Sequence, residues 1–475
     1  MARMPMGGLY QNIVHPDRIL AAYHLIREKH HDPEMGVYRR FTTGIDGVDL
    51  IEFDKQLEER LEECRVFLMD RGLPFYPQIL RKVPKDNGEM REVYISALRD
   101  KVIQKAMADV LSPWMERHYH PNLYSYRKGR FYGNGPAARK VHKLFSQAPD
   151  GLWVFKTDIP SYTDGIAQTL LLQKFRNILP DEPEVMELLE KFVHQRKCSH
   201  GIISSPIHGI PSGSSLTPIC ANFYLADLDR AMFVKRFEYT RFGDDILLLA
   251  DTEERLHAGI DVIKGYLEAH GLKLSEEKTV LAKPGEAFEY LGNQFQGAEI
   301  EVGSKAVRKY REWIRDQLPR RRYRHLSNAT PGDRKRFLKQ IVTDLNARCD
   351  RGMAQLPWIR SFPVVNRDER LRELDRYIKS RIRRCILRES TPRDRELVPE
   401  AWFREVGYKS VVGAYYRINR RRPLGPYTGW RKYYGTNYVE QLAEHQPVSF
   451  LTLKWREARS FLRFVKTNFF GAQTK

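Results

Sequence analysis

The chain has 475 residues, 42% of them hydrophobic, and its longest apolar stretches are too short to cross a membrane, so we expect a soluble protein with two or three packed units. The N-terminus MARMPMGGLYQNIV has no secretory apolar core and the five cysteines form no CxxC pair, which argues against a disulfide scaffold and predicts a cytoplasmic location. Lysine and arginine outnumber aspartate and glutamate by 80 to 60, and the resulting net charge of +20 predicts a polyanionic partner, most simply nucleic acid.

The first 60 residues are predicted to form a helical adaptor that includes a helix over DRILAAYHLIREKHH. A further helix is predicted over EFDKQLEERLEECRVFLMDRG, ending at Gly72. Its apolar positions at helical spacing are Leu57, Leu61, Cys64 and Phe67 or Leu68. Two short extended runs in YPQILRKVPKDNGEMREVYIS, separated by KDNG, then predict a hairpin.

The middle of the chain places acidic residues at the ends of two predicted strands. GLWVFKTDI has the composition of a strand and carries Asp158 at its end. Two helices follow, over IAQTLLLQKF and EVMELLEKFVHQ. GIPSGSSLTPICANFYLADLDRAMF predicts a glycine-rich turn and one amphipathic helix, and KRFEYTRFGDDILLLA predicts a second hairpin with Gly243, Asp244 and Asp245 at its bend. The helix RLHAGIDVIKGYLEAHG and the strands TVLAK and FEYLGNQF complete this part.

From about residue 300 onward the sequence is basic and mainly helical. In LRELDRYIKSRIRRCIL one predicted face carries Leu371, Leu374, Ile378, Ile382 and Cys385, and the other carries arginines. A solubilising surface would also explain the positive charge. However, aromatic residues interleave with arginines in RKYREWIRDQLPRRRYRH, which favours phosphate contact and base stacking. The aromatic segments WRKYYGTNY and FLRFVKTNFF are consistent with binding of structured RNA or with a helix core.

The three aspartates suit phosphoryl or nucleotidyl transfer. Such reactions gain from two metal ions about 3.5 to 4 Å apart, and Mg²⁺ prefers hard oxygen ligands. A strand-end Asp158 facing a hairpin with Asp244 and Asp245 can supply such a cage, although an isolated Asp-Asp pair is ordinarily a solvated turn. The only cation beside the pair in sequence is Arg241.

The order of these elements resembles that of the palm polymerases. It is most similar to the reverse transcriptases of group II introns and their bacterial relatives, including defence-associated and retron-like enzymes. PKDNGEMREVYI resembles the fingers hairpin of that family. The segments DKVIQKAM, LYSYRKGR, KTDIPSYTDGI, GIPSGSSLTPICANFYLADLD, RFGDDILLL, GLKLSEEKT and YLGNQF follow in the family's order. The C-terminal RLRELDRYIKSRIRR and EVGYKSVVGAYYRINRR are similar to its helical thumb.

The resemblance implies an α+β, right-hand polymerase fold with fingers, an antiparallel palm and a helical thumb. We expect an adaptor over 1–60, fingers over 61–150, the catalytic palm over 151–298, the thumb over 299–400 and a basic aromatic extension over 401–475. The activity implied is RNA-directed DNA polymerase, with an RNA template, dNTP substrates and two Mg²⁺ ions, for which Mn²⁺ can substitute. Whether the chain forms a homo-oligomer is left open.

The resemblance also implies roles for individual residues. Asp158, Asp244 and Asp245 would bind the metal ions together with the carbonyl of Ile159. Lys85 and Arg91 would contact the nucleotide triphosphate, unless they are merely an exposed charged turn. Gly213 would open the helix under the templating base. Lys278 would protonate the departing pyrophosphate, although an exposed lysine of no such role is equally consistent with the sequence.

Three departures from the family pattern bear on the product. Gly243 replaces the usual alanine of the turn, and Ser212 replaces a glutamine. Thr163 occupies the position at which the family has a bulky aromatic residue that blocks the ribose 2′-hydroxyl, and the nearest aromatic, Tyr162, lies one residue earlier.

Glycine before two aspartates, the Ser-Gly pair with Thr217 and Asn222 downstream, and the six-residue spacing between Asp158 and Asp164 also resemble viral RNA-dependent RNA polymerases. That resemblance implies that Asn222 and the second Asp recognise the ribose 2′-hydroxyl. The alternative is therefore an enzyme that makes RNA or accepts both kinds of nucleotide.

Other hypotheses concern metal and biological role. His194, Cys198, His200 and His208 suggest zinc, although their spacing matches no common structural site. A non-catalytic, maturase-like RNA-binding protein is an alternative of another class, against which the retained aspartates argue. No nuclease motif follows residue 300, and family analogy therefore favours bacterial antiviral defence with a dedicated noncoding RNA over intron mobility.

Overall fold

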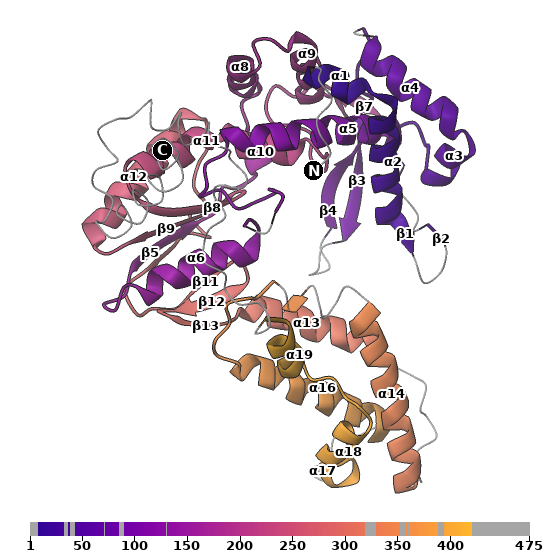
Figure 1. The fold of residues 1–475 in the computed structure, drawn as a ribbon, viewed down its shortest axis with the longest axis vertical. Coiled ribbons are helices and arrows are strands. Elements are labelled where there is room, and N and C mark those ends of the chain that lie inside the picture. The colour runs from indigo at the N-terminus through magenta and orange to yellow at the C-terminus, as the bar shows by residue number, and fades with distance from the viewer. Residues whose placement is uncertain are drawn as a thin grey trace, which may run out of the picture. The chain divides into compact units, whose positions relative to one another are not determined.

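Helices and short sheets alternate along the chain in the computed structural model (Figure 1). The structure describes residues 8–32, 37–38, 43–70, 72–84, 90–129, 131–318, 329–351, 358–359, 361–387 and 394–419. All of these belong to one unit, residues 1–423. The mixed α+β class expected from the sequence is confirmed, whereas the five domain boundaries stay predictions.

The N-terminal region is helical, as expected. Its elements are α1 (Leu9–Val14), α2 (Pro16–His30), the two-residue strands β1 (His31–Asp32) and β2 (Val37–Tyr38), α3 (Leu50–Lys55), α4 (Leu57–Met69) and the long α5 (Leu98–Met115). The single helix predicted over residues 52–72 was wrong, because it is two helices. Asp49 caps α3 by accepting from the N–H groups of Ile51 and Glu52, and Gln56 then leaves helical dihedral angles.

The hairpin predicted around KDNG is present. Its strands β3 (Gln78–Pro84) and β4 (Met90–Ile95) pair antiparallel, with Ile79 opposite Ile95. A second hairpin, β6 (Lys197–Ser199) and β7 (Ile202–Ser204), extends the sheet in the order β4-β3-β6-β7, because β6 pairs parallel to β3. Chain segments more than a hundred residues apart therefore share this sheet.

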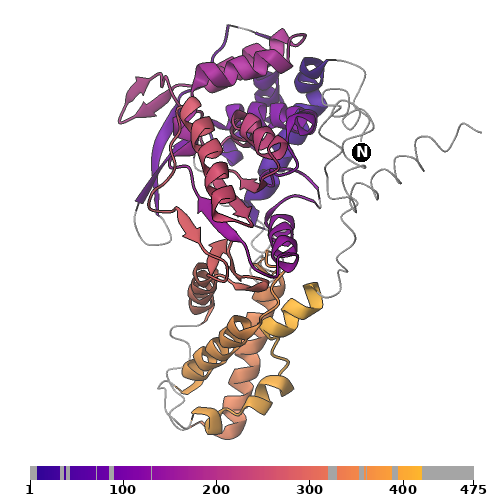
Figure 2. The ribbon, with the colours of Figure 1, turned by 90° about the vertical axis from the view of Figure 1, so that its left-hand side faces the viewer.

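The central sheet has the strand order β10-β5-β9-β8. It consists of β5 (Trp153–Thr157), β8 (Glu238–Phe242), β9 (Asp245–Ala250) and β10 (Val280–Ala282), all antiparallel. Alternate residues of β9 belong to two different cores: Ile246 and Leu248 share one with residues of α12 (Glu253–Ala269), whereas Leu247 and Leu249 share the other with residues of α6 (Asn134–Ser146). Both helices lie against the central sheet (Figures 1 and 2). The central strands are thus fixed from both faces.

Two further predictions for this region need correction. The helix predicted after GIPSGSS is divided at Leu225 into α10 (Thr217–Tyr224) and α11 (Ala226–Val234), because Leu225 has non-helical dihedrals. FEYLGNQF is not one strand. Positive φ angles at Leu291 and Gly292 make a tight turn between β11 (Phe288–Tyr290) and β12 (Asn293–Gln296), which β13 (Glu299–Val302) joins in a second small sheet.

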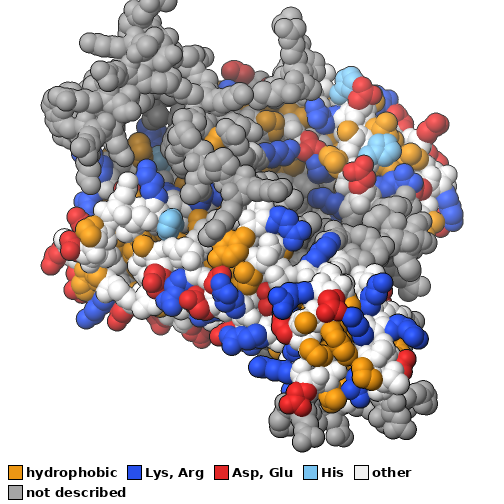
Figure 3. Space-filling view, turned by 60° about the horizontal axis from the view of Figure 1, so that its bottom comes forward, with side chains coloured by type: hydrophobic (Ala, Val, Ile, Leu, Met, Phe, Trp, Pro, Cys, Tyr) orange, Lys and Arg blue, Asp and Glu red, His pale blue; other side chains and the backbone are white. Residues whose placement is uncertain are grey.

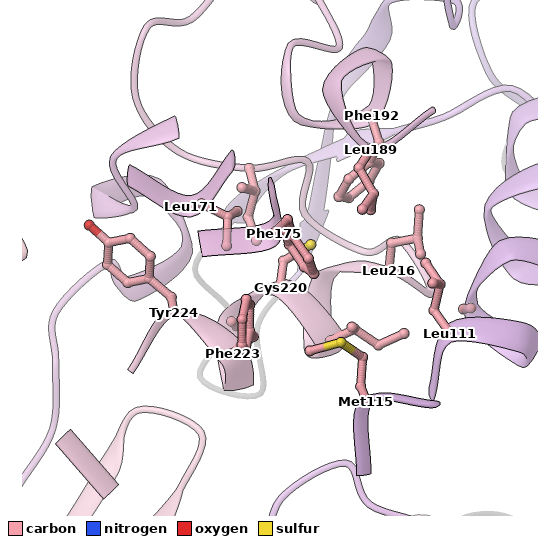
Figure 4. Close-up of a cluster of buried hydrophobic side chains, with 14 of the residues drawn as sticks. Leu111, Met115, Leu171, Phe175, Leu189, Phe192, Leu216, Cys220, Phe223 and Tyr224 are labelled. Atoms are coloured by element: carbon pink, nitrogen blue, oxygen red, sulfur yellow. The ribbon is translucent and has the colours of Figure 1, made fainter. Parts of the chain in front are cut away.

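A large apolar cluster supports the elements around the central sheet (Figure 4). Met115 of α5 points toward Phe223 of α10, and Leu111 of α5 lies beside Leu216. The predicted helices α8 (Gln168–Ile178) and α9 (Pro183–Val193) close the cluster with Leu171, Phe175, Leu189 and Phe192. The short elements η1 (Glu116–His118) and α7 (Tyr162–Gly165) lie in the connections.

The described residues beyond 303 are mainly helical, as predicted. Their helices are α13 (Ser304–Gln317), α14 (Pro331–Arg351), α16 (Glu369–Leu387), α17 (Asp394–Leu397), α18 (Glu400–Glu405) and α19 (Val411–Asn419). On α16 the predicted apolar face is buried except at Cys385, which is half-buried. The Asp375 side chain of α16 caps the start of α19. It accepts hydrogen bonds from the N–H groups of Val411 at 2.8 Å and Val412 at 3.2 Å.

Figure 3 turns these C-terminal helices toward the viewer and shows lysine and arginine side chains interspersed with acidic and apolar ones. Exposed cations of α13 include Lys305, Arg308, Lys309 and Arg315. The aromatic segments WRKYYGTNY and FLRFVKTNFF lie outside the described residues, as does part of RKYREWIRDQLPRRRYRH. Within the described part, the search for a helix long and apolar enough to cross a bilayer finds none.

Candidate active site

Sheet register brings the three predicted carboxylates to one edge of the central sheet. Strands β5 and β9 are antiparallel with Thr157 opposite Ile246, so Asp158 and Asp245 follow at the same end. Phe242 pairs with Asp245 across the bend of the β8–β9 hairpin, which leaves Gly243 and Asp244 as the loop. Gly243 has a φ of +68°, a conformation that glycine adopts without strain.

Negative charge at this edge is incompletely balanced. The Asp158 side chain is only 12% exposed, whereas Asp244 is exposed at the tip. The pKa of Asp244 is raised to about 6 by partial burial of its carboxyl group, by its hydrogen bond with Asp158 and by the charges of Asp158 and Asp245 together. Burial likewise raises the pKa of Asp245, opposed chiefly by the positive charge of Lys156. The carboxylates therefore favour an added positive charge.

Three lysines face the carboxylates. Lys278 forms an ion pair with Asp158, and the hydrogen bond between them raises the pKa of the Lys278 ammonium. Lys156 Nζ lies 3.8 Å from Asp245 Oδ1, and Lys305 acts on Asp245 through its charge. Sequence reasoning proposed Lys278 but missed the other two. The position of Lys156 could have been predicted from the sequence, because residues two apart on a strand point to the same face and Lys156 lies two residues before Asp158.

Arg241 lies behind the bend rather than among the carboxylates. It is completely buried, and its guanidinium binds both carboxylate oxygens of Asp229, with Nη2–Oδ2 at 2.6 Å and Nε–Oδ1 at 2.8 Å. It also donates to the carbonyl of Gly243 at 3.1 Å and of Asn222 at 2.9 Å. One buried side chain therefore holds the bend against α10 and α11.

Ser125 provides a second support for the bend. Its hydroxyl accepts from the N–H of Gly243 at 2.8 Å and donates to Oδ1 of Asn222 at 2.9 Å. Asn222 Nδ2 donates back to the Ser125 carbonyl at 3.0 Å. The side chain of Asn222, predicted to contact substrate, is 1% exposed and bonded at both ends to Ser125, so it lies behind the bend.

The other residues predicted to contact the sugar or to help bind metal are wholly or partly buried. Tyr162 is buried and its hydroxyl donates to the carbonyl of Ala221 on α10. Thr163 is half-buried, and its carbonyl accepts from the N–H of Ile210 at 2.9 Å. Ile159, whose carbonyl was predicted to help bind metal, has its side chain in the core.

The residues predicted to contact the template base and the triphosphate lie in different parts of the structure. Gly213 has a φ of +74° and lies in the turn before α10, which begins at Thr217 rather than at Gly213. The carbonyl of neighbouring Ser212 accepts from Nε2 of Gln78 on β3 at 3.2 Å. Lys85 lies outside the described residues, and Arg91 is on β4 without a described side chain. The triphosphate contacts therefore stay predictions.

The donor groups of the described side chains determine where a metal ion could bind. Among the described residues, no group of three or more His, Cys, Asp or Glu side chains is arranged to hold a metal ion. His194, Cys198, His200 and His208 therefore do not form a metal cluster. Asp158, Asp244 and Asp245 nevertheless fit a divalent cation chemically, because all three offer hard oxygen donors and the carboxyl pKa values of Asp244 and Asp245 are raised. The Lys278 ammonium takes one Asp158 oxygen.

Comparisons with known proteins agree with this arrangement. Residues 83–295 match the family model described as reverse transcriptase (RNA-dependent DNA polymerase). Protein YkfC of Escherichia coli is 24% identical over 301 residues, which cover 56% of this chain and 79% of YkfC. The group II intron-encoded protein LtrA of Lactococcus lactis is 23% identical over 236 residues, which cover 49% of this chain but only 36% of LtrA.

A telomerase structure from Candida albicans is 10% identical, with a TM-score of 0.40, and covers 75% of this chain and 65% of that one. A likeness of this size carries no argument about function. The family model and the intron-encoded relatives carry the assignment, and the aspartates at 158, 244 and 245 all lie within the matched segment. Residues 83–295 of the chain are therefore similar to reverse transcriptases, which are RNA-dependent DNA polymerases, over a segment that includes all three aspartates.

Proposed function

We propose that this chain extends a primer along an RNA template by two-metal nucleotidyl transfer at Asp158, Asp244 and Asp245. The observation that carries the proposal is the convergence of Asp158 with the β8–β9 bend. The carboxyls of Asp158 and Asp244 are within hydrogen-bonding reach, and Asp245 is close enough to each to act on it electrostatically. Asp244 and Asp245 have raised carboxyl pKa values at this sheet edge, which suits a site whose ligand is positively charged.

The side chains at the site would have different roles in the reaction. Asp158 and Asp244 would hold the divalent cations, Mg²⁺ or Mn²⁺, with Asp245 beside them. When bound, such ions lower the pKa of the primer hydroxyl and neutralise the pyrophosphate leaving group. Lys278 holds its proton on Nζ beside Asp158, where it can donate to a departing oxygen. Arg241 and Ser125 keep the bend in place throughout.

We favour dNTPs as the substrate. The alternative, an enzyme making RNA, relied partly on Asn222 reading the ribose 2′-hydroxyl. Both ends of the Asn222 amide bond Ser125 instead, and the side chain is buried. Thr163 remains a reason to expect relaxed sugar selection. Antiviral defence, a dedicated noncoding RNA and a cytoplasmic location stay predictions.

Primer extension on poly(rA)/oligo(dT) with Mg²⁺ tests the proposal, comparing wild type with Asp244→Asn. We expect the variant to lose at least about 100-fold in rate, since loss of a metal ligand removes about 3 kcal/mol or more of transition-state stabilisation. Asp251→Asn is the matched control, because Asp251 is exposed just beyond the other end of β9 and should retain activity. Equal extension by wild type and Asp244→Asn would exclude the proposed site.

A further inference from the structure

Tyr126 is a large aromatic residue beside the carboxylate bend that the catalytic proposal leaves unused. Its side chain is 65% exposed, and its ring centroid lies 6.4 Å from that of Phe242, the residue before the bend. A Cβ placed on Gly243 would lie 3.8 Å from Cε2 of Tyr126, in ordinary van der Waals contact. The ring therefore borders the space beside Gly243 that a side chain at that position would enter.

The backbone of Tyr126 is strained. Its φ is +54°, in the left-handed region that bulky side chains rarely adopt. Among the described residues other than glycine with positive φ, it is the only Tyr, Phe or Trp. Such a conformation costs about 1 to 3 kcal/mol and persists only where the surroundings impose it.

Neighbouring residues impose this conformation. Residues 122–124 run beside β8, because Arg241 donates its N–H to the Asn122 carbonyl and accepts from Tyr124, both at 2.9 Å. Ser125 is then fixed to Gly243 and Asn222. On the other side Arg127 is 7% exposed and binds Glu116 Oε2 at 2.7 Å and the carbonyl of His120 at 2.9 Å. Tyr126 is thus presented outward between two anchored residues.

Folding stability does not account for this arrangement. A ring that is 65% exposed gains little from burial, and an asparagine or glycine would adopt the same backbone conformation with less strain. What the tyrosine adds is an accessible aromatic face next to the acidic bend. Aromatic faces bind nucleic-acid bases by stacking, which is worth about 1 to 3 kcal/mol per base.

We propose that the Tyr126 ring contacts the nucleoside held at the carboxylate site and thereby positions it for reaction. The proposal rests on the proposed function and deepens it by assigning a substrate-contacting residue. The nucleoside belongs either to the incoming nucleotide or to the 3′ end of the primer. Both offer the same chemistry, a base or sugar face, and the experiment separates them.

The test compares wild type with Tyr126→Asn, which removes the ring but suits a positive φ, and with Tyr126→Phe, which keeps the ring. The strain-matched control is His200→Asn, because His200 also has a positive φ, +51°, and lies exposed in the β6–β7 turn. For each protein, KM for dTTP and kcat are measured on poly(rA)/oligo(dT). Primer–template affinity is measured by fluorescence anisotropy, and the midpoint of thermal unfolding is recorded.

We expect Tyr126→Asn to unfold at the wild-type temperature or above it while KM for dTTP rises about tenfold, with Tyr126→Phe and His200→Asn near wild type. A tenfold weaker primer–template affinity with unchanged KM also supports the contact and assigns it to the primer. The inference is overturned if Tyr126→Asn keeps both constants, or if it loses them only together with thermal stability.

Failure of the proposed function gives a different result. A wild-type protein that binds primer–template but does not extend it refutes catalysis. The anisotropy comparison is then made with and without dTTP, and a Tyr126→Asn protein that matches wild type in both conditions overturns the role of Tyr126. A wild-type protein that neither extends nor binds the duplex overturns both proposals.

Discussion

The two sides of the β8–β9 bend use the same kind of residue to opposite effect. Behind the bend, Asp229 is completely buried and each of its oxygens is bound by Arg241, with Tyr239 donating to Oδ1 as well. In front of the bend, Asp158, Asp244 and Asp245 lie close together with Lys278 as the direct partner of Asp158. Asp244, the residue at the tip, is exposed and has a raised pKa.

The contrast separates support from chemistry. A buried carboxylate with all its hydrogen bonds made can position backbone atoms but has no remaining capacity to bind a ligand. Carboxylates that repel one another are destabilising by themselves and become favourable when a cation joins them. The geometry of the front therefore depends on the back, because Arg241 and Ser125 hold opposite polar groups of Gly243, its carbonyl and its N–H.

The largest effect on stability is expected from breaking the buried pair. Asp229→Ala leaves the Arg241 guanidinium buried without its charge partner, which costs about 3 to 5 kcal/mol. Urea unfolding should therefore show a much lower midpoint, and primer extension should fall with it. Asp227→Ala is the control, because Asp227 lies on the same helix as Asp229 but its side chain is 61% exposed where it pairs with Lys174 of α8, so its loss should change stability by less than about 1 kcal/mol.

The double variant Asp229→Leu/Arg241→Met sharpens this comparison. Replacing both charges by apolar groups should recover much of the stability. Extension should nevertheless stay low, because the Gly243 carbonyl has lost its donor. Full recovery of both stability and activity would show that the Asp229–Arg241 pair contributes only to packing and does not position the bend.

The sequence was sufficient to predict elements with strong local patterns. The strand before Asp158, the hairpin at Gly243 and the apolar face of α16 follow from alternation, turn residues and helical spacing. The breaks at Gln56 and Leu225 were missed, because neither residue is a helix breaker and the interruption depends on the surrounding packing. The hairpin within FEYLGNQF had a signal, Gly292, that the strand prediction overlooked.

The site was predictable as a set of acidic residues but not as a network. Asp158 and the bend could be related by the order of strands. The partners of Asn222 could not, because Ser125 lies 97 residues away in sequence and meets it only through tertiary packing. The same applies to Arg241, which looked like a neighbour of the carboxylates in sequence but points to the opposite side of the bend. The alternation of side chains along a strand predicts which face of the sheet a residue occupies, but it does not predict which distant residues pack against that face.

A smaller effect is expected from removing one neutral hydrogen-bonding group behind the bend. Ser125→Ala leaves the Gly243 N–H and Asn222 Oδ1 without their hydroxyl partner in a buried place, at a cost of about 2 kcal/mol. The free energy of unfolding should fall by this amount in urea. Ser146→Ala is the matched control, because the Ser146 hydroxyl bonds the His142 carbonyl on an exposed part of α6 and should be nearly neutral. Equal losses in the two variants would contradict the supporting role of Ser125.

The smallest effect concerns the pH dependence of stability in front of the bend. The pKa of Asp244 is raised from 3.8 to about 6, so its stabilising contribution is fully present below about pH 4 and is lost as the pH rises through about 6. Because Asp244 is exposed, solvent screening reduces the contribution to below about 1 kcal/mol. In EDTA, wild type should therefore lose more stability than Asp244→Asn between about pH 5 and about pH 7.5, as measured by thermal unfolding.

Asp100 lies away from the bend, is completely buried, and has a pKa that burial raises to about 6. It adds a pH dependence of the same sign to wild type and to Asp244→Asn. Only the difference in stability between the two proteins therefore reports on the bend. Adding Mg²⁺ at the higher pH should raise the unfolding temperature of wild type and leave that of Asp244→Asn nearly unchanged, because binding to the folded state stabilises it in proportion to occupancy. Identical pH profiles and identical responses to Mg²⁺ would mean that the front carboxylates are as well balanced as Asp229. In that case the contrast between the two sides of the bend would not hold.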